Sequence, residues 1–267
     1  MKQVVKFSDL FGNRGEESYK RIPLLPVCHT TNLEAVRKML EHEEMRAVEF
    51  YEEFNECLLF FFYGRAPYIP EEQLHHRYDR RNPPIGFIFD LESFQRCPQR
   101  LVPFDSGGYE RYKINLPLKE FLIKPDSVSD EIKMFIWHLF SCNDNYLQKK
   151  LTIKPEHYPW CSPIGWLKHL YSFLEDRQAE TEFGDQAYTI EIQFVDSLPL
   201  TPLFIILPDR FGSTEEAKQQ VMSAFHLSGN EYDKKILLYR EDRTADVIYN
   251  YIVEEVNNKI SDIYKNL

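Results

Sequence analysis

The sequence predicts an α+β fold, because the apolar patterns of buried strands and of amphipathic helices both occur along it. The run LLFFFY at 58–63 is continuously apolar, as in a strand that is buried on both faces. By contrast, Leu33, Val36 and Leu40 recur at the spacing of one helical face. The aromatic content of 15%, with 20 Phe and 16 Tyr, also favours sheets.

Six segments have the patterns of strands. The first runs over RIPLLPVCH and ends at His29, and the second ends where Gly64 breaks its apolar run. The segment YTIEIQF alternates strictly between apolar and polar side chains, so one of its faces is expected to be buried. The predicted strands cover 21–29, 56–68, 85–90, 188–194, 203–208 and 235–240.

Five segments have the patterns of helices, and two of them begin at a capping box. Thr31 with Glu34 forms one box, and Ser213 with Glu216 forms the other. Ser129 or Asp130 is expected to cap a third helix. The last helix carries an apolar stripe of Ile248, Ile252, Val256, Ile260 and Ile263. The predicted helices cover 31–44, 129–140, 162–176, 213–229 and 244–264.

The length of 267 residues is sufficient for one large domain with a sizeable core. We expect an arm at 1–20, a core at 21–210, and an α/β extension at 211–267 that packs on the core. The N-terminal sequence lacks the apolar run of a signal peptide, and the longest apolar run is too short to span a bilayer. The five cysteines include no C-x-x-C pair, so neither a disulfide framework nor a metal site is expected. The sequence therefore predicts a cytoplasmic protein without membrane contact.

The net charge of −10 limits any contact with nucleic acid to a local basic patch. One dense basic and aromatic cluster is present in the loop sequence HHRYDRRNPP. Such a cluster would bind phosphates and stack on bases, although a solvated loop remains the alternative. The candidate substrate-binding residues of this cluster are His75, His76, Arg77, Tyr78, Arg80 and Arg81.

Three further places along the chain have residue types suited to a ligand site. His29 ends a strand directly before a helix whose first N–H groups would bind anions, or it is a structural histidine. Tyr63 and Arg65 flank a glycine at the end of an apolar strand, where they would stack on and clamp a phosphorylated planar ligand. A bulge with a salt bridge is the alternative there. Glu191 lies on the polar face of YTIEIQF with Thr189 and Gln193, and this face is either solvated or aimed into a cleft.

The sequence contains no P-loop, G-x-G-x-x-G, G-x-S-x-G or H-E-x-x-H motif. FDSGGY at 104–109 is interpreted as an Asx turn followed by glycines. The order of the segments is more informative. A strand ending in CHTTNLEAVRKML, an apolar strand running into FYGR, and TIEIQF followed by LPLTPLFIILP together resemble the ADP-ribosyltransferase fold. The resemblance covers 22–210 and is nearest to the DarT-like toxins, including the CmdT type of toxin–antitoxin–chaperone phage-defence systems.

This resemblance implies a split mixed sheet with flanking helices and a C-terminal helical extension. It also implies that NAD is the substrate and that ADP-ribose passes to an acceptor, which in this branch is often a nucleic-acid base. His29 and Thr30 match the strand end that holds NAD. Glu191 matches the catalytic Glu, which would bind the ribose 2′-hydroxyl and stabilise oxocarbenium-like charge, or take the proton of the acceptor. An antitoxin protein, with or without a chaperone, is an expected partner.

Two assignments rest on chemistry rather than on the resemblance. Tyr63 is expected to stack on the nicotinamide ring as a catalytic and NAD-binding residue, and Arg65 is expected to bind the pyrophosphate. Gln193 is assigned to substrate binding because it shares a face with Glu191. Thr189 occupies the position of the first Glu in the E-x-E motif of arginine-modifying toxins, which argues against an arginine acceptor.

Two other functions remain open at this point. A metal-independent ribonuclease that uses His29, Tyr63 and Arg65 would cleave RNA without NAD. A non-catalytic binding module with the same fold would show no turnover, and its phenotype would not depend on Glu191.

Overall fold

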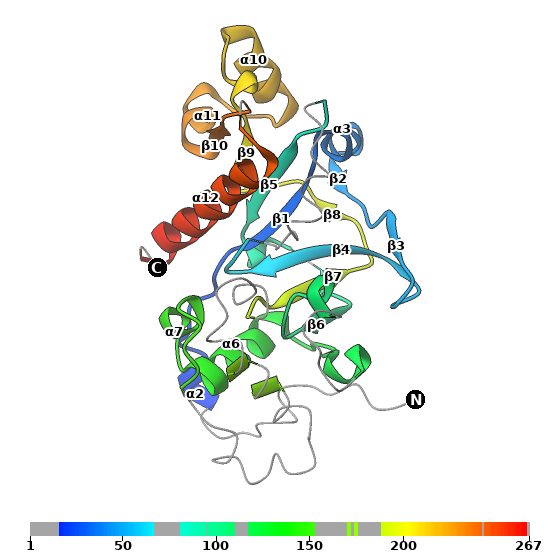
Figure 1. Cartoon of the computed structure of the whole chain (residues 1–267), viewed down its shortest axis with the longest axis vertical. Coiled ribbons are helices and arrows are strands. Elements are labelled where there is room, and N and C mark those ends of the chain that lie inside the picture. The colour runs from blue at the N-terminus through cyan, green and yellow to red at the C-terminus, as the bar shows by residue number, and fades with distance from the viewer. Residues whose placement is uncertain are drawn as a thin grey trace.

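The computed structural model in Figure 1 describes residues 16–66, 81–94, 96–109, 117–152, 170–171, 174–175, 188–241 and 243–265. Strands and helices both contribute to it, and the strands form one large mixed sheet with helices packed around it. The α+β class predicted from the apolar patterns is therefore confirmed.

Within the described residues the main sheet contains eight strands, in the order β10-β9-β5-β1-β4-β7-β6, with β3 paired to β4. Its pairs are antiparallel except for β9 with β10, which run parallel. The strands are β1 (Val27–Asn32), β3 (Glu49–Tyr51), β4 (Glu56–Tyr63), β5 (Pro84–Phe89), β6 (Arg100–Val102), β7 (Glu191–Phe194), β9 (Phe204–Pro208) and β10 (Ile236–Tyr239). A separate antiparallel pair joins β2 (Glu44–Met45) to β8 (Leu198–Pro199).

The main sheet separates between β1 and β4. These two strands pair only at Val27 with Tyr63 and at Cys28 with Phe62. By contrast, β1 pairs with β5 along all six of its residues, from Val27 to Asn32. The sheet is therefore continuous on each side of this junction, and it opens beyond Cys28.

Aromatic side chains fill the core on one side of β4. The Phe61 ring packs edge to face against Phe89, Phe94 and Phe194, with centroids 4.9–5.6 Å apart. These rings come from β4, β5, β7 and the segment after β5, so they hold distant parts of the chain together. Such edge-to-face pairs add to the stability that burial of the rings supplies.

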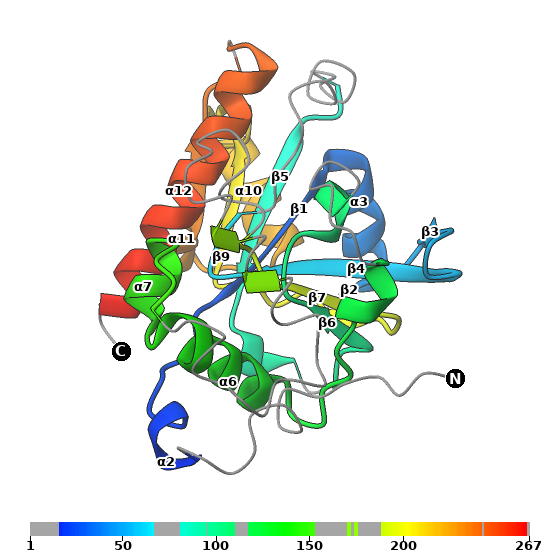
Figure 2. The same ribbon diagram turned by 60° about the horizontal axis from the view of Figure 1, so that its bottom comes forward.

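The helices pack along the sheet and at one end of it. Figure 2 shows α12 and α3 to either side of β1 and β5, and Figure 1 shows α2, α6 and α7 grouped together. Gly86 of β5 lets α12 approach, because a Cβ at this position would lie 3.4 Å from Ile252 and 3.2 Å from Ile206. The helices are α2 (Glu16–Tyr19), α3 (Leu33–His42), α6 (Val128–Phe140), α7 (Asn143–Leu147), α10 (Glu215–Ala224), α11 (Gly229–Lys235) and α12 (Ala245–Lys265).

Three helix starts differ by one or two residues from the sequence prediction. Asn32, not Thr31, caps α3, and its side chain accepts from the Ala35 N–H. Ser127 caps α6, and Thr214 caps α10. The box predicted at Thr31 was wrong because β1 continues through that residue. The box predicted at Ser213 was wrong because the neighbouring Thr214 is an equally suitable cap.

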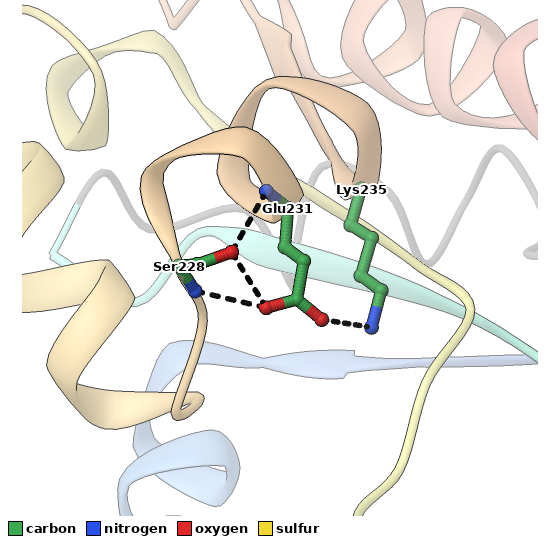
Figure 3. A network of polar contacts seen from close by, with 3 residues as sticks. All are labelled: Ser228, Glu231 and Lys235. Atoms are coloured by element: carbon green, nitrogen blue, oxygen red, sulfur yellow. Dashed lines mark hydrogen bonds and ion pairs between the residues drawn. The ribbon is translucent and has the colours of Figure 1, made fainter.

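The chain does contain a capping box, at α11, where the sequence analysis had not placed one. The Ser228 hydroxyl accepts from the Glu231 N–H, while the Glu231 carboxylate accepts from the Ser228 N–H at 2.9 Å (Figure 3). Lys235 approaches the same carboxylate at 3.4 Å. The single helix predicted at 213–229 is therefore wrong at its end, because α10 stops at Ala224 and the box at Ser228 starts a second helix.

The C-terminal segment contributes directly to the main sheet. Strand β10 pairs with β9 in parallel, and α10 and α11 connect the two strands. Ile248, Ile252, Val256 and Ile260 of α12 are buried, as their stripe predicted. The predicted boundary at 210 falls inside the 3-10 turn η6 (Asp209–Phe211), between β9 and α10.

Some predicted features lie outside the described residues. They include residues 1–15 of the arm, most of the helix expected at 162–176, and residues 75–80 of the basic cluster. No helix in the described part of the chain is both long enough and apolar enough to cross a membrane.

Candidate functional site

A cavity of about 730 Å³ opens where the sheet separates. Its walls come from β1, the first turns of α3, the β3–β4 hairpin, the turn after β6, and Glu191 of β7. This volume is within the range of small-molecule and cofactor sites. The cavity therefore joins segments that are far apart in the sequence.

Glu191 places a buried carboxylate in the cavity wall. The side chain is 1% exposed, and the residue pairs with Phe62 of β4 and Val102 of β6. The Ser106 N–H donates to Oε2 at 2.9 Å, and the Ser106 hydroxyl lies 2.7 Å from Oε1 and 2.9 Å from Oε2. The Gln193 amide donates to Oε1 at 2.5 Å. Both carboxylate oxygens are thus held in a fixed orientation.

The polar face of YTIEIQF is not solvated. Thr189, Glu191 and Gln193 are all 1% exposed or less. The solvated-face interpretation of this strand is therefore wrong. Period-2 alternation identifies two faces of a strand, but it does not show whether the polar face meets water or other protein groups.

The environment of Glu191 favours its protonated form. Burial raises its pKa well above the usual range of a carboxyl group, and the nearby charge of Asp105 raises the pKa further. The donors from Gln193 and Ser106 oppose this shift, because they stabilise the carboxylate. A carboxyl group with a raised pKa in a cavity is typical of an acid or base in catalysis.

A tight turn after β6 brings Ser106 to Glu191. The Asp105 side chain accepts from the Gly107 N–H at 2.9 Å, and the 3-10 turn η2 (Ser106–Gly108) follows. The predicted Asx turn in FDSGGY is therefore confirmed. The sequence analysis missed that this turn serves the candidate site. The only signal was a pair of polar residues, Asp105 and Ser106, before two glycines.

His29 lies where β1 leaves β4. Its Nδ1 is 2.9 Å from the carbonyl oxygen of Phe60. Because a carbonyl only accepts, Nδ1 must carry the proton in this contact. Burial lowers the pKa of His29, so the ring is neutral and Nε2 presents a lone pair. Nε2 is buried and has no hydrogen-bond partner among the described residues.

The structure brings three of the predicted site residues to one cavity. His29, Thr30 and Glu191 all line it. Gln193 is completely buried beside Glu191 and contacts its carboxylate without lining the cavity. The cavity wall thus includes both an ordered carboxylate and a neutral histidine.

Tyr63 does not line this cavity. It is completely buried, its hydroxyl accepts from the Leu25 N–H at 2.9 Å, and its carbonyl accepts from the Tyr146 hydroxyl at 2.8 Å. Phe62, its neighbour in β4, does line the cavity, and successive side chains of a strand point to opposite faces. The expectation that Tyr63 stacks on a ligand is corrected to a structural role in holding α7 against β4.

Arg65 is likewise committed to the protein interior. Its guanidinium donates to the carbonyls of Tyr146 and Leu147, at 2.6 Å for Leu147, and lies 5.2 Å from the Tyr146 ring centroid. Gly64 has a φ of +65°, which turns the chain away from the cavity after Tyr63. Arg65 is therefore not placed to bind a pyrophosphate there. The ribonuclease hypothesis required His29, Tyr63 and Arg65 in one site. Only His29 lines the cavity, so this site is not formed.

The first turn of α3 has no unsatisfied N–H groups for an anion. The Leu33 N–H donates to the Pro83 carbonyl at 3.0 Å, and the Glu34 N–H donates to the Asn82 side chain at 2.7 Å. The Ala35 N–H donates to Asn32 at 2.9 Å. The expected anion site at this helix start is therefore wrong, since capping groups already occupy it.

The described end of the basic cluster borders the cavity. Arg81 is exposed, and Asn82 and Pro84, which follow it, line the cavity. The placement of residues 75–80 is outside the described part of the chain, so their role stays a prediction. No group of three or more potential metal-ligating side chains occurs among the described residues.

Comparison with known proteins gave no match, whether to a family model, to a curated protein or to a solved structure. The functional proposal therefore draws on the geometry of the cavity and on the resemblance in the order of the sequence segments.

Proposed function

We propose that this protein is an ADP-ribosyltransferase that uses NAD as its substrate and modifies a nucleic acid. The observation that carries the proposal is the shared cavity of Glu191 and His29, in which the carboxylate is buried and fixed by Ser106. A fixed carboxylate beside a reacting ribose is suited to a reaction that develops positive charge on the sugar. The resemblance of the sequence to DarT-like toxins supports the same chemistry.

In the proposed reaction, the bond between the ribose C1′ and the nicotinamide nitrogen breaks. The bonding electron pair leaves with nicotinamide, which departs as a neutral molecule, and positive charge develops on the ribose. Glu191 ionises as the pH rises through its raised pKa, and in this ionised form it stabilises the charge and accepts a hydrogen bond from a ribose hydroxyl. A nucleophilic atom of the acceptor then bonds to C1′ and gives its proton to Glu191 or to water.

His29 complements Glu191 in this proposal. His29 lines the cavity and its buried Nε2 carries a lone pair, which would accept a hydrogen bond from a second hydroxyl of a ligand that reaches it. Because Nδ1 is tied to the Phe60 carbonyl, the orientation of the ring is fixed before a ligand binds. Fixed acceptors on both sides of a sugar orient its C1′ for attack.

The nucleic-acid acceptor is proposed from the resemblance and from the basic cluster. Asn82 and Pro84, which follow that cluster in the sequence, lie in the cavity wall. An overall charge of −10 requires that any nucleic acid be held locally. By the same resemblance we propose that the enzyme acts as a toxin in phage defence and that an antitoxin protein neutralises it.

The decisive experiment incubates the purified protein with labelled NAD and, separately, with RNA, DNA or cell protein. Label in RNA or DNA supports the proposal, and label confined to protein overturns the nucleic-acid acceptor. Glu191→Gln should abolish labelling while circular dichroism and the melting temperature stay native-like. Glu131→Gln is the matched control, because Glu131 is also buried but does not line the cavity.

Two outcomes would replace the proposal. Cleavage of RNA without NAD would make the protein a ribonuclease. Absence of any NAD consumption with all three acceptors, in protein shown to be folded, would favour a binding module.

A further inference from the structure

Arg100 brings a buried positive charge close to Glu191. It belongs to β6, is 8% exposed, and pairs directly with Gln193 of β7. Residues that lie opposite each other in an antiparallel pair have their side chains on the same face, and a long side chain also reaches the diagonal neighbour. Glu191 is the diagonal neighbour of Arg100, since the residue directly opposite Glu191 is Val102.

Two carboxylates share the positive charge of Arg100. Its guanidinium forms an ion pair with Glu56 of β4, and it also interacts electrostatically with Glu191. The side chain of Glu56 is 33% exposed, whereas Glu191 is almost completely buried. The Gln99 amide donates to Glu56 at 3.4 Å, so Glu56 is held beside β6. The carboxylate in direct contact with Arg100 is thus the more exposed one.

The guanidinium also packs on an aromatic ring of the cavity wall. Phe54, in the turn between β3 and β4, lines the cavity, and the Arg100 Cζ lies 4.8 Å from its ring centroid. An Arg over a ring face is favoured electrostatically, and the contact restricts the plane of the guanidinium. Arg100 itself does not line the cavity. It is therefore held in place by the β3–β4 hairpin and acts on the cavity only through its neighbours.

We propose that Arg100 is a positioning residue whose positive charge is divided between Glu56 and Glu191. The part that acts on Glu191 favours the ionised carboxylate, and the negative charge of Glu56 reduces that part. The inference rests on the proposed function, in which the ionised form of Glu191 stabilises the charge that develops on the ribose. Arg100 and Glu56 together then set the pH at which the site becomes active.

Other titratable groups around Glu191 act on the same equilibrium. Asp105, in the turn after β6, opposes the ionisation of Glu191. His29 of β1 lines the cavity and is neutral, because burial lowers its pKa. All of these groups remain in the variants Arg100→Gln and Glu56→Gln, so their effect is common to both. The remaining titratable side chains of the described cavity wall belong to Arg46, Glu49, Tyr51, Glu53 and Tyr249.

The substitutions Arg100→Gln and Glu56→Gln have opposite expected effects. Removing the cation should raise the pKa of Glu191, and removing the competing carboxylate should lower it. A purely structural ion pair predicts instead that both variants lose stability without opposite shifts of this pKa. Arg100→Lys keeps the charge and should stay close to the wild type. Arg96→Gln is the matched control, because Arg96 forms an exposed ion pair with Asp196 and does not line the cavity.

Urea unfolding at pH values between about 4 and 10 measures these shifts independently of catalysis. Each variant is compared with the same variant carrying Glu191→Gln, so that the titrations of other groups largely cancel. The difference in the free energy of unfolding falls as pH rises and becomes constant above the pKa of Glu191 in the folded chain. Relative to the wild type, this point should move up by about 0.5–1 pH unit in Arg100→Gln and down by a similar amount in Glu56→Gln. It should not move in Arg100→Lys or Arg96→Gln.

Shifts in the same direction in Arg100→Gln and Glu56→Gln, or an unchanged profile in Arg100→Gln, would overturn the inference. If Arg100→Gln does not fold, Glu56→Gln decides alone, and any result other than a shift to lower pH rejects the shared cation. NAD consumption is measured in parallel over the same pH range. Shifted stability profiles without consumption reject only the transferase, and consumption with unshifted profiles rejects only the role of Arg100.

Discussion

Ser106 holds the Glu191 carboxylate through both its backbone N–H and its hydroxyl, although the two residues are 85 positions apart in the chain. The contact joins the turn after β6 to the first residue of β7. It fixes the direction of the carboxylate and stabilises the ionised form against the effect of burial.

Replacing Ser106 by Ala should therefore lower the rate of NAD consumption. The hydroxyl bond to a charged group is lost, which corresponds to a fall of about 10-fold to 100-fold. The pKa of Glu191 should rise further, so the increase of rate with pH should move to higher pH. Ser106→Thr keeps a hydroxyl and should restore most of the rate. A lower rate with an unshifted pH profile would show that Ser106 acts only through stability.

The protonation of Glu191 predicts how stability depends on pH. In the unfolded chain a glutamate titrates near pH 4.3, whereas burial raises the pKa of Glu191 in the folded chain. Between these values the folded state keeps a proton that the unfolded state has lost. The free energy of unfolding contributed by Glu191 is therefore present at low pH and is lost as pH rises through the folded pKa.

Urea titrations at several pH values between about 4 and 9 check this sign. Glu191→Gln has no titrating group at this position. Its free energy of unfolding should therefore increase relative to that of the wild type as pH rises. A difference that is constant with pH would mean that the pKa of Glu191 is not raised.

His29 should matter both to the sheet and to the ligand. His29→Phe keeps an aromatic ring but removes Nδ1 and Nε2, so the Phe60 carbonyl loses its donor. We expect a loss of about 1 kcal/mol in the free energy of unfolding and a fall in NAD consumption of at least about tenfold. His42→Phe is the control, because His42 is an exposed residue at the end of α3 that lies outside the cavity wall, and it should change neither quantity. Full activity in His29→Phe would remove His29 from the proposed site.

Tyr63 should be important for stability and unimportant for chemistry. Tyr63→Phe leaves the buried Leu25 N–H without its acceptor, which costs about 1–3 kcal/mol of unfolding free energy. NAD consumption per folded molecule should stay unchanged. If this variant kept native stability but lost activity, Tyr63 would belong to the site after all.

Much of the sheet could be predicted from the sequence because its strands are marked by strong local patterns. LLFFFY and IGFIF are continuous runs without polar side chains, and they form most of β4 and β5, which flank β1 in the sheet. Helix α12 was also predictable, since Ile248, Ile252, Val256 and Ile260 share one face. The helix starts were less predictable, because a Ser or Thr one position away offers nearly the same cap.

The candidate site could be predicted only in part. Glu191 stood out because it lies at the centre of the alternating segment YTIEIQF and matches the catalytic Glu in the family that the segment order resembles. Ser106 did not stand out, because its contact with Glu191 depends on the pairing of β6 with β7. No local sequence pattern predicts that pairing. Tyr63 was misplaced for a different reason. A continuous apolar run does not reveal which of its alternate residues face a cavity.

The narrow junction between β1 and β4 has a mechanical consequence. Only Val27 and Cys28 of β1 pair with β4, whereas whole strands pair on either side. Widening the gap beside His29 therefore breaks few hydrogen bonds, while bending β5 against β1 would break many. The contact of His29 Nδ1 with the Phe60 carbonyl spans this gap, so we expect its loss to weaken the junction far more than a single lost bond would weaken the pairing of β1 with β5.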